Sequence, residues 1–334
     1  MPALPDPRGD TTAALFRALR EAPHPLAPVP LPAGPDPIAD EDLQLALYCC
    51  YELHYRGLDD VDERWEWEPS LLALRAALEA PFEAALREAV GPVGPVPEPG
   101  AMDVALRAIE DDGPSLSRYV EREATRGQVL EFLIHRSAYQ LKEADPHSWA
   151  LPRLSGGPKA ALVEIQADEY GGGRPERIHA RLFADAMAAA GLDATYGAYV
   201  GRLPATTLAT VNLMSLCGLH RRLRGAIVGH LALFEMTSSI PNRRYATGLR
   251  RLGLDAATPF FDEHVEADAV HEAVAAVDLA GGLARQEPEL AGDILWGARA
   301  LAALEARWAE LLLGAWERGA VSYTHLTLPT TERV

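Results

Sequence analysis

The apolar residues along most of the chain recur with the period of an α-helix. Leu and Ala repeat every three or four residues in DEDLQLALYCCYELHYRGL from residue 40 and in EPSLLALRAALEAPFEAALREAV from residue 68, which predicts two helices. Alternating β-branched stretches of strand length are almost absent before the C-terminus, so we expect an all-α protein. The periodicity predicts further helices at about 101–110, 115–143, 157–170, 175–190, 204–238, 243–252, 258–280 and 288–318.

Proline-rich segments divide this pattern. Ten prolines fall within residues 1–38, and proline blocks helix interiors and sheet ladders, so we expect an extended N-terminal arm there. A second cluster, GPVGPVPEPG at 91–100, predicts a linker. We therefore expect accessory helices and a linker at 39–100, a catalytic helical bundle at 101–319 and an atypical tail at 320–334. The tail is Thr-rich and strand-like, and we expect it to be foreign to the rest, with an authentic helix cut near Gly319.

Composition indicates a soluble globular protein. Hydrophobic residues make up 48% and charged residues 24%, a balance that allows a sizeable core. The net charge of -17 disfavours nucleic acid and anionic membranes as partners, since both need a basic face. No signal-peptide pattern and no apolar run of spanning length appears, and the three cysteines have no framework spacing. We therefore expect a cytoplasmic protein with reduced thiols.

The segment FFDEHVEADAVHE at 260–272 carries the most informative polar pattern. His264, Asp268 and His271 stand at i, i+4 and i+7, so they share one face of a helix. Two imidazoles and a carboxylate suit iron, manganese or zinc. The alternative is an exposed polar stripe, but the neighbouring phenylalanines and valines indicate a buried helix.

Four further carboxylates extend the pattern. Glu176 and His179 form a Glu-x-x-His pair of the kind that helical di-metal proteins use, and Glu169 lies seven residues before Glu176, beyond a glycine run. Glu235 lies in the apolar helix segment HLALFEM, where an unpaired carboxylate would cost several kcal/mol, so we expect it to be protonated or bound to a cation. Glu143 stands at a helix end, where the dipole disfavours a surface acid. Glu131 and His135 are spare candidates.

With these motifs the chain resembles the haem-oxygenase-like di-iron oxidases, the bacterial iron-containing redox enzymes. The resemblance covers about residues 115–318, and its carriers are LKEADPHSW at 141–149, EIQADEYGGGRPERIH at 164–179, FEMTSSIPNRRY at 234–245 and FFDEHVEADAVHE at 260–272. It implies a haem-oxygenase-like helical bundle, to which the N-terminal helices are an addition. Known members include N-oxygenases of amino-acid-derived amines and guanidines, and oxidases that cleave C–C bonds in fatty or amino acids.

The resemblance also implies a ligand set. The family's metal ligands fall on Glu143, Glu176, His179, Glu235, His264, Asp268 and His271, and Glu169 stands where some N-oxygenating members have one more ligand. Asp268, between the two histidines, would be a bridging or shared ligand. Arg243, Arg244 and Tyr245 follow Glu235 and are candidates to orient a carboxylate-bearing substrate. A capping or surface role for the two arginines stays open.

These features predict an oxidoreductase that uses two irons, cycling between Fe²⁺ and Fe³⁺, and dioxygen to oxidise an amine, amino acid or fatty acid, without haem. The alternative is an iron-binding or storage bundle without turnover, which a closed site with no substrate-sized cavity would favour. A haem protein would need one proximal histidine rather than this ligand set, and hydrolytic di-metal sites usually follow strands. We expect a small-molecule substrate, leave the electron donor open, and regard a homodimer as compatible with such a bundle.

Overall fold

The computed structural model describes residues 2–94, 98–109 and 113–323, and the backbone alone at residue 99 and residues 266–270. Within these residues there are helices and turns but no strand, which confirms the predicted all-α class. The α-helices are α1 (Asp10–Leu19), α2 (Glu41–Glu52), α3 (Pro69–Val90), α4 (Met102–Arg107), α5 (Leu116–Arg122), α6 (Arg126–Gln140), α7 (Asp145–Ser148), α8 (Gly156–Glu169), α9 (His179–Ala189), α10 (Ala205–Leu219), α11 (Arg224–Arg251), α12 (Pro259–Ala273), α13 (Gly281–Gln286) and α14 (Ala291–Glu317).

Tighter and wider turns connect these helices. A π-helical turn, η9 (Val274–Ala280), joins α12 to α13 without a break. The 3₁₀ turns are η1 (Glu63–Trp67), η2 (Pro99–Ala101), η3 (Leu151–Arg153), η4 (Gly171–Gly173), η5 (Pro175–Arg177), η6 (Val200–Arg202), η7 (Arg221–Leu223), η8 (Asp255–Ala257) and η10 (Pro288–Leu290). π-helical turns occur often at functional sites, and η9 directly follows a helix that carries two candidate ligands.

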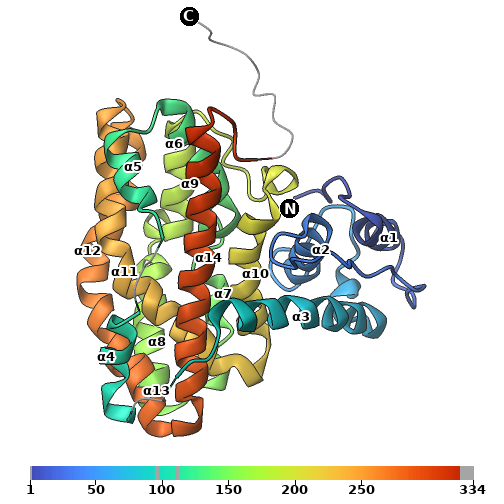
Figure 1. Cartoon of the computed structure of the whole chain (residues 1–334), viewed down its shortest axis with the longest axis horizontal. Coiled ribbons are helices and arrows are strands. Elements are labelled where there is room, and N and C mark those ends of the chain that lie inside the picture. The colour runs from blue at the N-terminus through green and yellow to red at the C-terminus, as the bar shows by residue number, and fades with distance from the viewer. Residues whose placement is uncertain (1, 95–97, 110–112, 324–334) are drawn as a thin grey trace, which may run out of the picture.

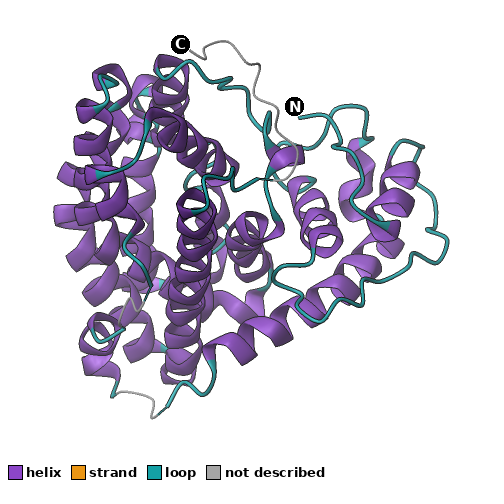
Figure 2. Ribbon diagram, turned by 45° about the horizontal axis from the view of Figure 1, so that its top comes forward, coloured by secondary structure: helices purple, strands orange, loops and turns teal. Residues whose placement is uncertain are grey.

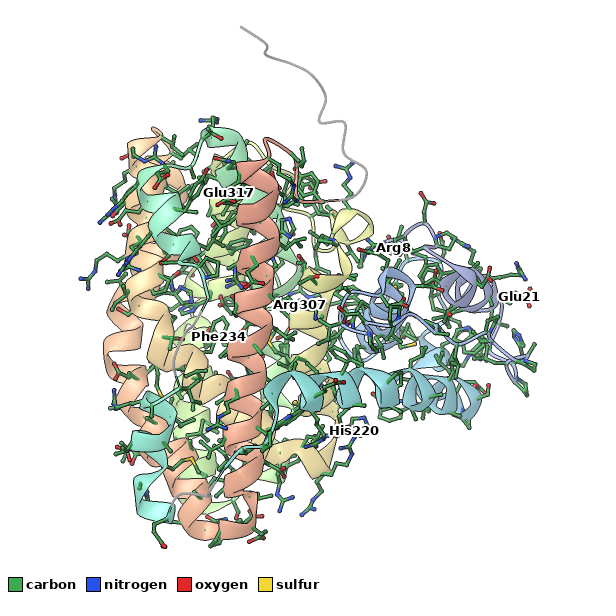
Figure 3. The ribbon with its side chains drawn as sticks, in the orientation of Figure 1. Arg8, Glu21, His220, Phe234, Arg307 and Glu317 are labelled. Carbon is green, nitrogen blue, oxygen red and sulfur yellow. The ribbon has the colours of Figure 1, made fainter. Side chains whose placement is uncertain are left out.

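The long helices stand side by side in one bundle, and the N-terminal helices lie against its flank (Figures 1 and 2). The longest helix, α11, packs against α14, α12 and α5, and α10 packs against α2 of the N-terminal part. In Figure 3 Phe234 lies inside the bundle, whereas Glu21 lies at the outer end of the N-terminal helices. None of the described helices is both long and apolar enough to cross a bilayer.

The prolines predicted an extended N-terminal arm, but part of this arm is helical. Residues 10–19 contain no proline and form α1, which buries Leu15, Phe16 and Leu19. The Asp42 carboxylate accepts hydrogen bonds at 2.9 Å from the backbone N–H groups of Thr11 and Thr12, which otherwise lack an intrahelical partner. The N-terminus of α1 is therefore capped by Asp42 of the neighbouring helix α2, a tertiary contact that sequence periodicity does not predict.

The longest helices approach closely through two glycines. A Cβ added at Gly229 of α11 would lie 1.8 Å from the carbonyl oxygen of Ile294, and one at Gly297 of α14 would lie 2.0 Å from that of Ala226. Any side chain here would push the two helices apart, because such contacts lie far inside van der Waals distance. This close crossing fixes the position of α11, which carries Glu235.

The prediction of separate helices at 204–238 and 243–252 is wrong, because α11 continues through Pro241 to Arg251. A proline inside a helix costs about 3 kcal/mol, and packing of α11 on three neighbouring helices offsets this. The Thr237 hydroxyl donates to the Leu233 carbonyl at 2.7 Å, a local bond that is common at helix bends. The real break lies earlier, at His220, between α10 and α11.

Candidate metal centre

Six buried side chains, three carboxylates and three imidazoles, meet in the middle of the bundle. Glu143 comes from the turn after α6, Glu169 is the last residue of α8, His179 is the first of α9, Glu235 lies on α11, and α12 supplies two histidines. None is more than 6% exposed: Glu143, Glu169, His179, Glu235, His264 and His271. Buried charges are rare unless they are paired or bind metal.

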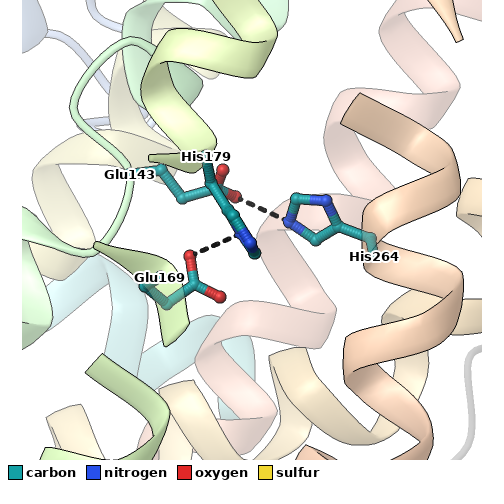
Figure 4. A group of neighbouring side chains, drawn as sticks. All are labelled: Glu143, Glu169, His179 and His264. Carbon is teal, nitrogen blue, oxygen red and sulfur yellow. Dashed lines mark ion pairs between the residues drawn. The ribbon is translucent and has the colours of Figure 1, made fainter. Parts of the chain in front are cut away.

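The first group consists of Glu143, Glu169, His179 and His264, each with a donor atom within 4.8 Å of the others. Figure 4 shows the four side chains converging from separate segments. His179 Nδ1 lies 3.0 Å from Glu169 Oε2, and His264 Nε2 lies 3.5 Å from Glu143 Oε1. This is the donor set of a nitrogen- and oxygen-liganded transition metal.

The second group consists of Glu169, Glu235 and His271, within the same distance limit. His271 Nδ1 lies 3.3 Å from Glu235 Oε2. Glu169 belongs to both groups, and it has two oxygens, so one carboxylate can serve two neighbouring cations. The two groups therefore have the form of a pair of adjacent sites joined by Glu169.

Two histidines are oriented by partners outside the groups. The Phe260 carbonyl accepts a hydrogen bond from His264 Nδ1 at 2.8 Å, which leaves Nε2 to face Glu143. His271 Nε2 lies 3.0 Å from the Asp168 carboxylate, which leaves Nδ1 to face Glu235. Metal-binding histidines commonly hold their second nitrogen in this way. Asp168 was missed by sequence reasoning, although its neighbour Glu169 was not.

Protons compensate for the carboxylates in the metal-free protein. Burial lowers the pKa of His271, but Glu235 and Asp168 outweigh burial and raise that pKa to about 9. Burial likewise opposes charge on His179, and Glu169 outweighs it, so the pKa of His179 is raised. Burial raises the pKa of Glu169, but His179 above all lowers it below its usual value. A bound cation would replace these protons, because metal ligands must be deprotonated.

A small cavity between the ligands and a buried carboxylate oxygen without a hydrogen-bond partner are also consistent with a bound cation. The Glu143 Oε2 atom is buried and makes no hydrogen bond, which in itself is costly. A cavity of about 10 Å³ lies between Glu143, Glu169, Glu235 and His264, the scale of a single water or ion. The described residues that line this small cavity include no Lys or Arg.

Two backbone features place the ligands. Ala144, directly after Glu143, has a left-handed conformation with φ of 71°, which is strained for a residue with a Cβ; the Gln166 amide holds its carbonyl at 2.9 Å. After α8 the chain turns at Gly171, with φ of 75°, where a Cβ would lie 2.7 Å from the Ile178 nitrogen. Only glycine fits this turn, and the turn brings His179 back to Glu169.

The structure brings together most but not all of the predicted ligands. Glu143, His179, Glu235, His264 and His271 meet, together with Glu169. Glu176 does not join either group: it is exposed and lies in η5, ahead of α9, so the Glu-x-x-His pair does not share a helix. The Asp268 side chain lies outside the described residues. Whether these residues bind iron stays a prediction.

The other predicted residues lie around the centre or away from it. Tyr245 is buried and lines the cavity described below, whereas Arg243 is exposed and Arg244 donates to the Ser117 hydroxyl at 3.2 Å. The spare candidates Glu131 and His135 lie outside both groups. His135 contacts Thr207 and Ser322, and Ser322 also donates to Glu131, so the start of the atypical tail packs on them.

A larger cavity of about 200 Å³ opens beside the first group. Glu143 and His264 form one part of its wall, and Arg136 and Glu305 another. Aromatic and aliphatic side chains make up much of the rest, among them Phe132, Phe183, Phe260, Phe261 and Trp308. An apolar cavity with a few convergent polar groups is the usual form of a small-molecule site.

A family model matches the region that contains these residues. The model of the iron-containing redox enzyme family matches residues 130–306, which is more than half of the chain. The chain belongs to this family. The matched region runs from α6 into α14 and contains all six residues of the two groups.

Membership confirms the resemblance inferred from the motifs and the haem-oxygenase-like, all-α fold. It also indicates an iron-dependent redox function for the chain. The helices α1–α5 lie outside the matched region. A comparison with curated proteins gives no match.

Proposed function

We propose that this chain is a non-haem di-iron enzyme that uses dioxygen to oxidise a small organic molecule bound in the cavity. The observation that carries the proposal is the pair of buried ligand groups joined by Glu169. Two groups of this kind suit two irons, as in other helical bundles with paired carboxylates and histidines. A haem would need one axial ligand and gives no reason for six converging donors.

The two irons, when bound, would supply the electrons and the coordination positions that dioxygen needs for its reduction. The residues around them have separate tasks. Glu143, Glu169 and Glu235 would balance the cationic charge, and Glu169, which belongs to both groups, would serve both ions. Asp168 and the Phe260 carbonyl hold the two histidines of α12 in orientation, as outer partners of metal ligands generally do. Phe183 and Phe260 keep the wall beside His264 apolar.

The alternative function is iron storage or transport without turnover. The cavity of about 200 Å³ beside Glu143 and His264 favours an enzyme, since a store has no need for an organic substrate site next to its metal. The same cavity argues for a substrate that is mainly apolar, because aromatic side chains make up much of its wall.

The test is to load the full chain anaerobically with Fe(II), add dioxygen, and follow visible absorption and oxygen uptake. We expect a transient visible band and rapid oxygen consumption with the iron content unchanged. Iron that oxidises no faster than free Fe(II) in buffer would contradict the proposal. Iron content that keeps rising over successive additions of Fe(II) and dioxygen would instead support storage.

A further inference from the structure

Two buried polar side chains line the small cavity at the candidate metal centre without belonging to either ligand group. They are His147 and Gln166, which are 1% and 3% exposed. Among the described residues, neither His147 Nδ1 nor Gln166 Oε1 has a hydrogen-bond partner. A buried polar atom without a partner is costly, so the two atoms indicate that the cavity holds something besides the ligands already described.

The chain turn after Glu143 brings His147 to the same cavity as Glu143. Ala144, between Glu143 and α7, has the left-handed conformation described above. Gln166 crosses to this turn from α8, and its Nε2 donates to the Ala144 carbonyl at 2.9 Å and to the Ser148 hydroxyl at 2.7 Å. Both amide protons are therefore used, which identifies Oε1 as the free end of the Gln166 amide and as a hydrogen-bond acceptor.

The other nitrogen of His147 is held by a second buried histidine. His147 Nε2 lies 3.1 Å from His230 Nδ1 of α11, and the His230 ring stacks on Phe234. One nitrogen of this pair donates and the other accepts. When His230 donates, the imidazole of His147 carries its proton on Nδ1, where it can donate into the cavity.

The small cavity therefore has a donor and an acceptor in its wall in addition to the ligand groups. Its volume of about 10 Å³ is the scale of one water molecule. A water molecule or a hydroxide ion can accept from His147, donate to Gln166 and still keep a lone pair for a cation.

The geometry points to His147 as the hydrogen-bond donor to one small exogenous ligand of the metal centre, a water molecule or hydroxide, with Gln166 Oε1 beside it as an acceptor. This inference rests on the proposed function and adds to it a residue that neither ligand group contains. His147 would bind the small ligand directly, and His230 would act as a positioning residue that fixes the proton of His147 on Nδ1.

The place of this small ligand differs from that of the organic molecule. The small cavity and the cavity of about 200 Å³ share four wall residues, Glu143, Phe234, Ser238 and His264, whereas His147 and Gln166 line the small cavity alone. A ligand at His147 would thus lie next to a molecule in the larger cavity without occupying the same space.

A purely structural role is the competing explanation, since the histidine pair joins α7 to α11. Such a role affects the free energy of unfolding but not the affinity of the loaded centre for a small ligand. His135 of α6 provides a matched control. It is 1% exposed and bonds to Thr207 and Ser322, outside the wall of the small cavity. His135→Leu therefore removes a buried, hydrogen-bonded imidazole without touching this cavity.

The test titrates azide into the full chain loaded with Co(II) and follows the visible spectrum. Azide accepts hydrogen bonds but cannot donate, so it reports on His147 rather than on Gln166. We expect His147→Leu to weaken azide binding by at least about tenfold, because a buried hydrogen bond to a charged group is lost. His147→Gln, whose amide can donate, should stay within about threefold of the unmodified protein, and His135→Leu should bind azide unchanged.

Equal azide affinity in His147→Leu and the unmodified protein, at equal cobalt content, would overturn the inference. If His147→Leu does not fold, His230→Leu decides, because it keeps His147 but removes the partner that fixes its proton. We expect at least about threefold weaker azide binding there, and unchanged binding would overturn the inference. An unmodified protein that holds cobalt but shows no spectral response to azide would also overturn it.

Cobalt content, iron content and the oxygen reaction of the iron-loaded protein are measured for every variant. Normal metal content and normal oxygen chemistry, with azide binding that is independent of both histidines, defeat this inference alone. Absence of bound metal from the unmodified protein defeats the proposed function.

Discussion

Two buried clusters of charged residues lie side by side in this protein, and they have opposite charge balance. In one, Lys142 Nζ lies 2.9 Å from Glu52 Oε2, and the Tyr196 hydroxyl donates to Glu52 Oε1 at 2.6 Å. In the other, three glutamates and three histidines meet, and the described residues that line the small cavity between them include no Lys or Arg. The first cluster contains its own cation, Lys142, whereas the glutamates of the second are balanced only by protons on its histidines or by a bound cation.

The two clusters are adjacent in sequence as well as in space. Lys142 is 1% exposed and reaches α2, and Glu143 is 4% exposed and faces the candidate metal centre. The Lys142 ammonium also lies 4.3 Å from the centre of the Tyr55 ring, which adds a favourable cation–π contact. Burial alone therefore does not identify a metal site. The charge balance and the unpartnered Glu143 Oε2 atom are the features that make the second cluster a candidate metal site.

The largest effect on the free energy of unfolding is expected at the cluster of Lys142 and Glu52. Lys142→Met leaves the Glu52 carboxylate buried without its cation, which should lower the free energy of unfolding by about 3–5 kcal/mol. Urea titration of the metal-free protein measures this, and Glu52→Gln combined with Lys142→Met should recover much of the loss. Iron content per folded chain should stay as in the unmodified protein. A folded Lys142→Met protein without iron would show that the two clusters act as one.

A substitution at Glu143, the next residue, should change stability less but should weaken metal binding directly. Glu143→Gln removes a negative charge from a carboxylate whose Oε2 atom has no hydrogen-bond partner. The free energy of unfolding of the metal-free protein should therefore change by less than about 1 kcal/mol. A site filled at a hundred times its dissociation constant stabilises a protein by about 2.7 kcal/mol. We expect Fe(II) to stabilise the unmodified chain by at least this amount and the variant by much less.

Urea titrations with and without anaerobic Fe(II) make the comparison, with Lys142→Met as the neighbouring control. Equal stabilisation of the Glu143→Gln protein and the unmodified chain by Fe(II) would remove Glu143 from the ligand set.

The smallest effect is a dependence of metal affinity on pH. The pKa of His271 is raised to about 9, so its imidazole carries a proton at neutral pH in the metal-free protein and must lose it to bind a metal. Affinity should therefore rise with pH up to about 9, by up to about tenfold per pH unit for one displaced proton. Titration with Co(II), followed by its visible spectrum, measures this slope. The slope should decrease by about one proton in His271→Ala, and a flat profile in the unmodified protein would contradict the compensation of carboxylates by protons.

Helix periodicity predicted most of the bundle because amphipathic spacing records which face is buried. Periodicity failed where tertiary contacts determine whether a segment is helical. Residues 10–19 form a helix capped by Asp42, and α11 continues through Pro241 because three helices pack on it.

The candidate site was predictable where its ligands share one helix, as His264 and His271 do on α12. Spacing misled at Glu176, because a glycine turn with a positive φ at Gly171 separates α8 from α9 and brings Glu169 to His179 instead. Asp168 and the pair Arg136–Glu305 could not be read from spacing, since their contacts join residues more than a hundred positions apart. These residues are brought together by packing between helices, which a local sequence pattern does not record.

The most direct test of the central claim is the iron content of the full chain after anaerobic loading with Fe(II) and removal of unbound metal. The account predicts about two irons per chain in the unmodified protein and in Lys142→Met, and almost none in the double variant His264→Ala with His271→Ala. Iron near zero in the unmodified protein, or iron that survives the loss of both histidines, would contradict it.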